Sequence, residues 1–163
     1  MRKFSEKNYR PCVGIVLINN GSIFAGQRLD YKSDAWQMPQ GGIEENESPI
    51  RAAVRELKEE TGIKKKHVKI ILESKNWINY DLPKELIPKL WNGKFVGQSQ
   101  KWFAMEFLGS DSDVNINTKN PEFSKWQWMT KNKLLDSIVP FKKRVYENIL
   151  SQFSAKLNRS EER

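Results

Sequence analysis

Cysteine and histidine are almost absent from this chain. Each occurs once, as Cys12 inside an apolar run and as His67 after three lysines. One cysteine excludes a disulfide framework within the chain. A histidine with no second histidine or cysteine nearby does not match the ligand spacing of zinc sites. We therefore expect Cys12 to be a buried small apolar residue and His67 to be a surface residue.

Long apolar runs, repeats and low-complexity tracts are also missing. No segment approaches the roughly 18 consecutive apolar residues of a membrane-spanning helix, and no apolar stretch follows the basic start of the chain. These absences predict a soluble, cytoplasmic protein with no membrane partner. The 163 residues suit one domain, which we expect over 1–157, followed by a frayed tail over 158–163.

Acidic residues are in the minority. The 20 Asp and Glu residues face 28 Lys and Arg residues, so the net charge is +8. Such a charge favours phosphate-rich or nucleic-acid partners, but it also aids solubility. Composition alone leaves both readings open.

Turn residues and apolar periodicity predict a mixed α/β chain. A hairpin is expected over 9–28, because Asn19-Asn20-Gly21 separates two apolar runs. Further strands are expected at Val68–Leu72, which reads as buried, and at Gln100–Leu108 and Trp126–Trp128. Trp77–Gly97 should be a long covering loop with one short helix over Lys84–Ile87. Pro140 should open a final helix with an apolar stripe up to Leu157.

The element with the clearest start and stop signals is a helix between Ser48 and Gly62. Ser48 suits the N-cap, Pro49 the first turn and Gly62 the left-handed residue that ends a helix. The apolar stripe predicted to face the core consists of Ile50, Ala53, Val54 and Leu57.

Three glutamates, Glu56, Glu59 and Glu60, lie beside this stripe at i, i+3 and i+4 spacing. Three carboxylates on one patch at the negative end of the helix dipole repel one another. A hard divalent cation such as magnesium or manganese would relieve that repulsion. The alternative is a solvated acidic helix end, with Arg55 paired to Glu59.

The pattern around these glutamates resembles the signature of the Nudix hydrolases in full. The matching residues are Gly41, Glu47, Arg55, Glu56, Leu57, Glu59, Glu60, Gly62 and Ile63. The resemblance implies an αβα sandwich with a mixed central sheet, the signature loop and helix at 41–63 and a C-terminal helix. It also implies hydrolysis of a nucleoside diphosphate linked to a further group.

The same resemblance implies the roles of the signature residues. Magnesium, or manganese or another divalent metal in its place, would be bound by Glu56, Glu59 and Glu60, with the Gly41 carbonyl as a further ligand. Glu47 and Arg55 would join the loop to the helix by a salt bridge. The base that takes a proton from water would be Glu56 or a glutamate on a separate loop.

Segments outside the signature look like the bacterial RNA pyrophosphohydrolase branch, also described as dinucleoside polyphosphate hydrolases. They include Tyr9-Arg10-Pro11, Trp36-Gln37 with Pro39-Gln40, Gln98 with Gln100-Lys101-Trp102-Phe103, Pro121-Glu122-Phe123, and Phe141-Lys142. In this branch the glutamate at the position of Glu122 approaches the metals, so Glu122 is a candidate fourth ligand or base. An ordinary loop carboxylate is the alternative.

The branch holds an RNA base between an arginine and a phenylalanine, which correspond to Arg28 and Phe141, with Val139 beside them. Phe141 lies off the apolar stripe of the final helix, where it can stack on a base. It can equally be a hydrophobic staple at the helix start. Candidate phosphate contacts are Arg10, Gln98, Lys101 and Lys142. Ser99 stands where the branch usually has a basic residue, and Met38 where a phenylalanine is common.

The resulting expectation is an enzyme that converts 5′-triphosphate RNA ends to 5′-monophosphate ends and so starts RNA decay, with no DNA specificity. Hydrolysis of dinucleoside polyphosphates by the same chemistry is the second hypothesis. A catalytically idle RNA-binding module is the third. The preferred 5′ nucleotide, the number of metals, the oligomeric state and any protein partner do not follow from the sequence.

Overall fold

The computed structural model describes residues 8–29 and 35–157, which contain one eight-stranded sheet. Its strands are β1 (Tyr9–Asn19), β2 (Ser22–Arg28), β3 (Trp36–Gln37), β4 (Gln40–Gly42), β5 (Val68–Glu73), β6 (Ile78–Asp81), β7 (Gly97–Phe107) and β8 (Phe123–Met129). The central order is β3-β2-β1-β7-β5, while β4 pairs with β1, β6 with β7 and β8 with β2. β1 and β7 are parallel and the other pairs are antiparallel. The sheet is mixed, as predicted.

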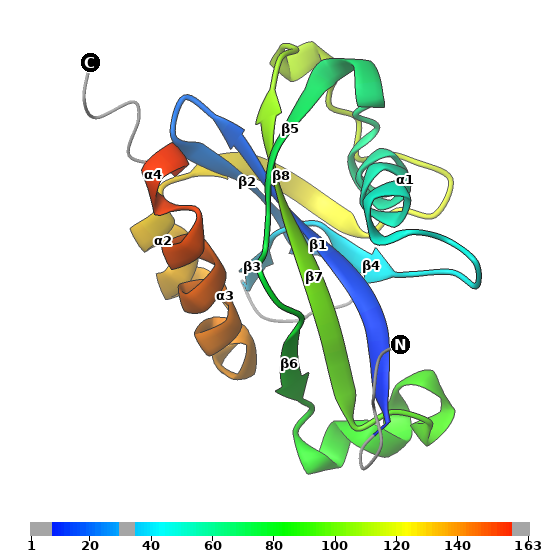
Figure 1. Cartoon of the computed structure of the whole chain (residues 1–163). Coiled ribbons are helices and arrows are strands. Elements are labelled where there is room, and N and C mark those ends of the chain that lie inside the picture. The colour runs from blue at the N-terminus through cyan, green and yellow to red at the C-terminus, as the bar shows by residue number, and fades with distance from the viewer. Residues whose placement is uncertain (1–7, 30–34, 158–163) are drawn as a thin grey trace.

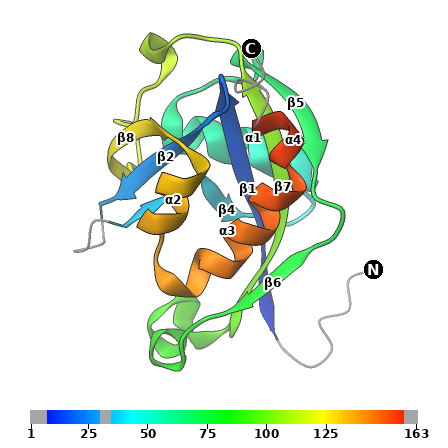
Figure 2. The ribbon, with the colours of Figure 1, turned by 90° about the vertical axis from the view of Figure 1, so that its left-hand side faces the viewer.

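Helices cover both faces of the sheet (Figure 1 and Figure 2). They are α1 (Pro49–Thr61) on one face, and α2 (Lys131–Ser137), α3 (Pro140–Gln152) and α4 (Ser154–Leu157) on the other. Single turns of 3₁₀ helix are η1 (Lys65–His67), η3 (Trp91–Gly93) and η4 (Asp111–Asp113), and the longer η2 spans Lys84–Lys89. The expected αβα sandwich is confirmed.

The alternation of β7 explains why both faces need a cover. Phe103, Met105 and Phe107 belong to the core under α1, whereas Trp102 and Ala104 belong to the core under α3. Successive side chains of a strand point to opposite faces of the sheet. A strand with apolar residues on both faces therefore needs a covering layer on each face. The sheet therefore separates two cores, one under α1 and one under α3.

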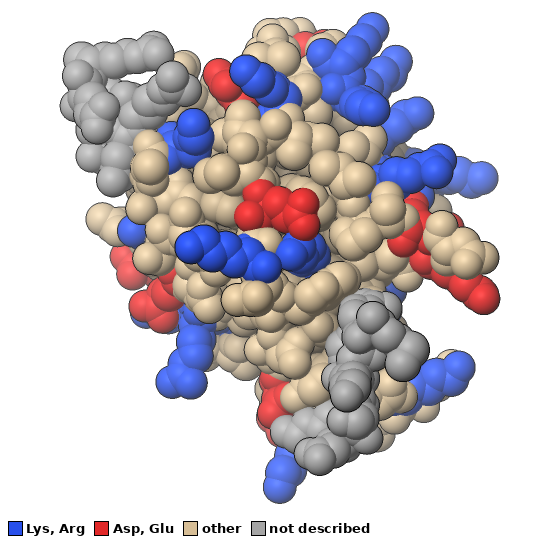
Figure 3. Space-filling model, viewed as in Figure 1, with Lys and Arg blue, Asp and Glu red and all other residues tan. Residues whose placement is uncertain are grey.

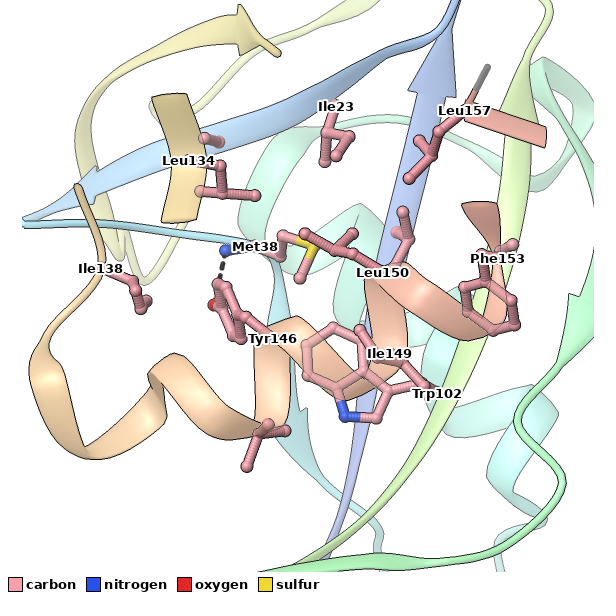
Figure 4. Close-up of a cluster of buried hydrophobic side chains, with 14 of the residues drawn as sticks. Ile23, Met38, Trp102, Leu134, Ile138, Tyr146, Ile149, Leu150, Phe153 and Leu157 are labelled. Carbon is pink, nitrogen blue, oxygen red and sulfur yellow. Dashed lines mark hydrogen bonds between the residues drawn. The ribbon is translucent and has the colours of Figure 1, made fainter. Parts of the chain in front are cut away.

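The core under α3 is built from the predicted apolar stripe (Figure 4). Val145, Tyr146, Ile149, Leu150, Phe153 and Leu157 are all buried. Tyr146 also packs edge-on against Trp102, and its hydroxyl oxygen accepts a hydrogen bond from the backbone N–H of Met38 at 2.8 Å. The chain turns at Phe153, so the predicted single helix is two helices in the structure. These contacts fix the position of α3 on the sheet.

The helix α1 begins and ends as predicted. The Ser48 hydroxyl accepts from the N–H of Arg51, and Gly62 ends the helix with a φ of 74°. The predicted buried stripe is partly wrong, because Ile50 is 38% exposed while Ala52 and Glu60 are buried. The buried face is thus rotated toward Glu60, and the three glutamates differ in their exposure.

Three other expectations about the elements need correction. Trp77–Gly97 contains the strand β6, which pairs with the first half of β7. β5 was expected to be buried, but it lies at the end of the sheet order and leaves Leu72 exposed. The helix α2 was not predicted; it is capped by the Thr130 hydroxyl and anchored by buried Leu134. Tertiary contacts set these short elements, because their own apolar periodicity is weak.

Cys12 is buried, as predicted, and burial raises the pKa of its thiol to about 11. His67 is only partly exposed, with a side-chain exposure of 25%. The expected frayed tail over 158–163 lies outside the described residues.

Basic side chains are spread around the rim of the face seen in Figure 3, and a small acidic group with basic neighbours lies near its centre. The positive charge on this face is therefore not one continuous patch. Among the described residues, no helix has the length and apolar character needed to cross a membrane.

Candidate active site

The strand β4 and the helix α1 bring the signature residues together. β4 pairs with β1, with Val13 opposite Gly41, and the turn after it leads into Ser48 and the helix. The Glu56 carboxylate lies so close to the Cα of Gly41 that a Cβ atom at this position would overlap it. A glycine is therefore needed at 41 to make room for a carboxylate.

Arg55 joins the loop to the helix. Its guanidinium makes two hydrogen bonds to Glu47, at 2.8 and 2.9 Å, and one to the Gly42 carbonyl at 2.8 Å. It also donates to Glu56 at 2.8 Å and to Glu59 at 3.3 Å. The expected salt bridge between Glu47 and Arg55 is present. One cation thus fixes the loop and partly neutralises two of the three helix glutamates.

We expect Glu47→Gln to lower the free energy of unfolding by about 2 kcal/mol at neutral pH, because a fork-shaped charged pair becomes a weaker neutral contact. The Arg55 guanidinium lowers the pKa of Glu47 to about 2. A lowered folded-state pKa stabilises the fold above the ordinary pKa, and this contribution is lost as the pH falls from about 4.5 toward 2. Urea unfolding of both proteins across that window should show the difference shrinking on acidification. A difference that stays constant with pH would contradict the assignment.

The three helix glutamates lie in different environments. Glu60 is 5% exposed and accepts a hydrogen bond from the Gln40 N–H at 3.2 Å. The side chain of Glu56 is 13% exposed, whereas that of Glu59 is 57% exposed. Burial raises the pKa of Glu60 well above its ordinary value, and the charges of Glu56 and Glu122 add to this effect. Burial also raises the pKa of Glu56, against the opposing influence of Arg55.

This donor set fits a divalent cation. Buried Glu60 has no cationic side chain among the hydrogen-bond partners found for it, and it couples electrostatically to Glu56 and Glu122. A hard cation bound by carboxylate oxygens would remove the cost of that buried negative charge. In the parts of the chain that the structure describes, no three such side chains already stand at ligand distance. Arg55 donates to one carboxylate oxygen of Glu56 and one of Glu59, which leaves the second oxygen of each for a cation.

The carboxylates open into a pocket of about 520 Å³. Predicted site residues that line it are Arg10, Arg28, Gly41, Glu56, Glu59, Glu60, Gln98, Glu122, Phe141 and Lys142. They come from β1, β2, β4, α1, β7, α3 and the loop before β8. Residues that are far apart in the sequence thus share one acidic pocket with cationic and aromatic walls.

The loop of Glu122 is tied to the end of β2. The N–H of Leu29 donates to the Glu122 carbonyl at 2.9 Å, just after Arg28. Phe123, the next residue, is buried against Gly26, where a Cβ atom would overlap its ring. Glu122 is exposed at the pocket wall, next in space to the predicted base-binding arginine.

Two predicted substrate-binding residues do not line this pocket. Lys101 lies one residue from Gln100 on β7 and points to the opposite face from Gln98 and Gln100. Its ammonium is 3.3 Å from Glu73. Val139 is the residue before α3 and packs on the core under that helix. Their placement does not favour direct substrate contacts, which stay predictions for both residues.

The sequence reading missed several pocket residues. They are Gln37, Gln40, Tyr80, Leu82, Leu86, Leu90 and Trp91. Five of them lie in the segment Trp77–Gly97, which was expected to be a covering loop. Its two prolines and scattered apolar residues indicated a cover, but no periodicity showed which side chains face inward.

Trp91 supports Arg10 at the pocket wall. The guanidinium carbon of Arg10 lies 5.0 Å from the centre of the Trp91 ring, a distance typical of a cation–π contact. Trp91, Asn92 and Gly93 have φ values of 48°, 58° and 71°, and the left-handed region costs about 1 kcal/mol or more for a residue with a side chain. The strained turn thus holds an aromatic ring over a candidate phosphate ligand.

We expect Trp91→Ala to raise KM for the phosphorylated substrate by about three- to tenfold with little change in kcat, since Arg10 loses its ring. Trp91→Phe keeps a ring and should restore most of the binding. Steady-state kinetics on both variants, with thermal melting as a check of folding, tests this. An equal loss in the two variants would show that the indole fills space and does not hold Arg10.

Comparisons with known proteins agree with this geometry. The NUDIX domain model matches residues 8–149. A protein of Dinoroseobacter shibae named RNA pyrophosphohydrolase is 54% identical over 147 residues, which cover 90% of this chain and 92% of that protein. One of the same name from Rickettsia canadensis is 51% identical over 160 residues, covering 95% of this chain and 98% of that protein.

Solved structures share the fold at low sequence identity. A Caenorhabditis elegans Ap4A hydrolase has a TM-score of 0.65 at 20% identity, covering 90% of this chain and 98% of that chain. The dihydroneopterin triphosphate pyrophosphohydrolase of Escherichia coli has a TM-score of 0.68 at 19% identity, covering 90% and 99%. A domain match over most of the chain, relatives above 50% identity and a complete signature around one acidic pocket lead to one conclusion. The chain belongs to the NUDIX domain family and is a Nudix hydrolase.

Proposed function

We propose that this enzyme removes pyrophosphate from the 5′-triphosphate end of RNA and leaves the 5′-monophosphate end from which RNA decay starts. The observation that carries this proposal is that the signature carboxylates, Arg28 and Phe141 line the same pocket. An acidic site for cations and phosphates thus adjoins a cation and a ring that can hold a base. The relatives above 50% identity that are named RNA pyrophosphohydrolase support it. For an enzyme with this substrate we propose a location in the cytoplasm.

The proposed cofactor is Mg²⁺, with Mn²⁺ as a substitute. Glu56, Glu59 and Glu60 would hold it, together with the Gly41 carbonyl and Glu122. When bound, divalent cations neutralise phosphate oxygens and lower the pKa of a coordinated water. Gly41 leaves the space that the Glu56 carboxylate occupies, and Arg55 donates a hydrogen bond to one oxygen of that carboxylate.

The reaction needs one proton acceptor. A water oxygen attacks a phosphorus of the anhydride, the bond from that phosphorus to the bridging oxygen breaks, and a carboxylate takes the water proton. Glu56 and Glu122 are the two candidates. Glu56 is the better oriented of the two, because Arg55 and Gly41 restrict it while Glu122 is exposed.

The remaining pocket residues would hold the substrate. Arg28 and Phe141 lie on β2 and α3, where they can bind the two faces of one base. Arg10, Gln98 and Lys142 offer donors to phosphate oxygens. Lys142 is buried, and its ammonium donates to the side-chain oxygen of Gln37 at 3.2 Å. Its charge is therefore held at a fixed position in the pocket wall.

Hydrolysis of end-labelled 5′-triphosphate RNA, with identification of both products, tests the function. With Mg²⁺ we expect 5′-monophosphate RNA and released pyrophosphate or phosphate, and no products after chelation of the metal. Dinucleoside polyphosphate is measured in parallel. A large preference for the dinucleotide would replace RNA as the substrate, and metal-independent RNA binding without turnover would indicate a binding module.

A further inference from the structure

A second pocket adjoins the catalytic pocket across two aromatic rings. It has a volume of about 530 Å³, and both pockets are lined by Tyr80 and Phe141. The ring centres of these residues are 6.0 Å apart, with an angle of 37° between the planes. The pair is therefore a shared wall, with the carboxylates on one side and an unassigned pocket on the other.

The chemistry of the second pocket suits an unpaired nucleotide. Asn79 and Asn148 bring amide groups that both donate and accept, Arg144 brings a guanidinium, and Tyr9 adds an aromatic ring. The Tyr9 hydroxyl donates to Asp81 at 2.5 Å, which fixes that ring at the pocket edge. Proteins bind single-stranded RNA with rings that stack on bases, polar groups that hydrogen-bond base edges and cations that bind phosphates.

One face of α3 connects the two pockets. Phe141, Arg144, Val145 and Asn148 all line the second pocket and follow i, i+3, i+4 and i+7 spacing. Residues with this spacing lie on the same side of a helix. From Phe141 to Asn148 the helix rises by roughly 10 Å, which is well beyond the step of about 3.4 Å between stacked bases. A chain held at Phe141 can thus continue along α3 to Arg144.

We propose that the second pocket is a subsite for the nucleotides on the 3′ side of the base held at Phe141, with Arg144 binding their phosphate. This inference rests on the proposed action on RNA. In this arrangement the enzyme binds nucleotides of the RNA beyond its 5′ end. Short triphosphates lack the nucleotides that would fill the subsite.

The test compares 5′-triphosphate RNAs of two and eight nucleotides with the same 5′ sequence. Wild-type kcat/KM should be higher for the longer RNA. Arg144→Glu should lower kcat/KM about tenfold for the longer RNA and leave the shorter one unchanged, as expected for one charged contact to phosphate. Lys143→Glu is the matched control, because it makes the same charge change one residue away, on an exposed side chain that lines neither pocket.

Binding supplies a readout that does not depend on turnover. In a Glu56→Gln background, Arg144→Glu should reduce the slope of log affinity against log salt by about 0.7 for the longer RNA. Equal effects of Arg144→Glu and Lys143→Glu, or equal wild-type kcat/KM for both lengths, overturn the subsite while the proposed function stands. An equal loss on a dinucleoside polyphosphate also overturns it. If the wild-type enzyme cleaves neither RNA, both the proposed function and the proposed subsite are wrong.

Discussion

Glu56→Gln should reduce kcat for triphosphate RNA by about a thousandfold or more, because it removes a metal ligand and a candidate base. The fold should be retained. The Gln side-chain oxygen can still accept the hydrogen bond that Arg55 donates to Glu56 at 2.8 Å, and the buried negative charge near Glu60 decreases. Single-turnover kinetics and thermal melting measure the two effects separately.

Glu147→Gln is the matched control for this variant. Glu147 is an exposed glutamate on α3 that does not line the pocket, so its neutralisation should leave kcat unchanged. Glu122→Gln completes the comparison, since it removes the other candidate base. Full activity in Glu56→Gln would contradict the proposed mechanism. A larger loss of kcat in Glu122→Gln than in Glu56→Gln would show that Glu122 is the base.

Gly41→Ala should lower kcat by about a hundredfold, with a small effect on stability. The new Cβ would overlap the Glu56 carboxylate, which is the far end of a flexible side chain and can move away. A displacement of about 1 Å at a catalytic group is enough for a loss of this size. The variant therefore changes the position of Glu56 and keeps its chemistry.

Gly42→Ala provides the contrast on the neighbouring residue of β4. Its Cβ would overlap the guanidinium of Arg10 instead. If Arg10 binds phosphate, Gly42→Ala should raise KM and leave kcat nearly unchanged. Measuring kcat and KM of both variants on triphosphate RNA distinguishes the two effects. The same loss of kcat in both would show a general distortion of β4, contrary to the expectation.

The features that could be predicted from the sequence are those with local signals. Ser48 and Gly62 define the limits of α1 by their own backbone preferences, and both cap it in the structure. The alternation from Trp102 to Phe107 predicted a strand, and β7 contains these residues. Each of these signals depends on a few neighbouring residues and needs no knowledge of the tertiary fold.

Features set by distant contacts were missed. β6 forms because Ile78–Asp81 pairs with the first residues of β7, about twenty positions further along the chain. The burial of Glu60 follows from how α1 is rotated on the sheet, and helical periodicity treated Ile50 as the inward residue instead. Trp91 reaches Arg10 through a left-handed turn, which the types of Asn92 and Gly93 favour but that of Trp91 does not.

The parallel pairing of β1 with β7 also bears on the synthesis of the protein. Tyr9 lies opposite Gly97, and the pocket takes residues from Arg10 to Lys142. During translation the amino-terminal half carries all three helix glutamates long before β7, Glu122 and α3 exist. Because α3 follows all eight strands of the described sheet, the proposed base-binding wall is completed only after Phe141 has been synthesised. A chain interrupted before Pro140 would thus have the glutamates of the site without Phe141 and Lys142 in the pocket wall.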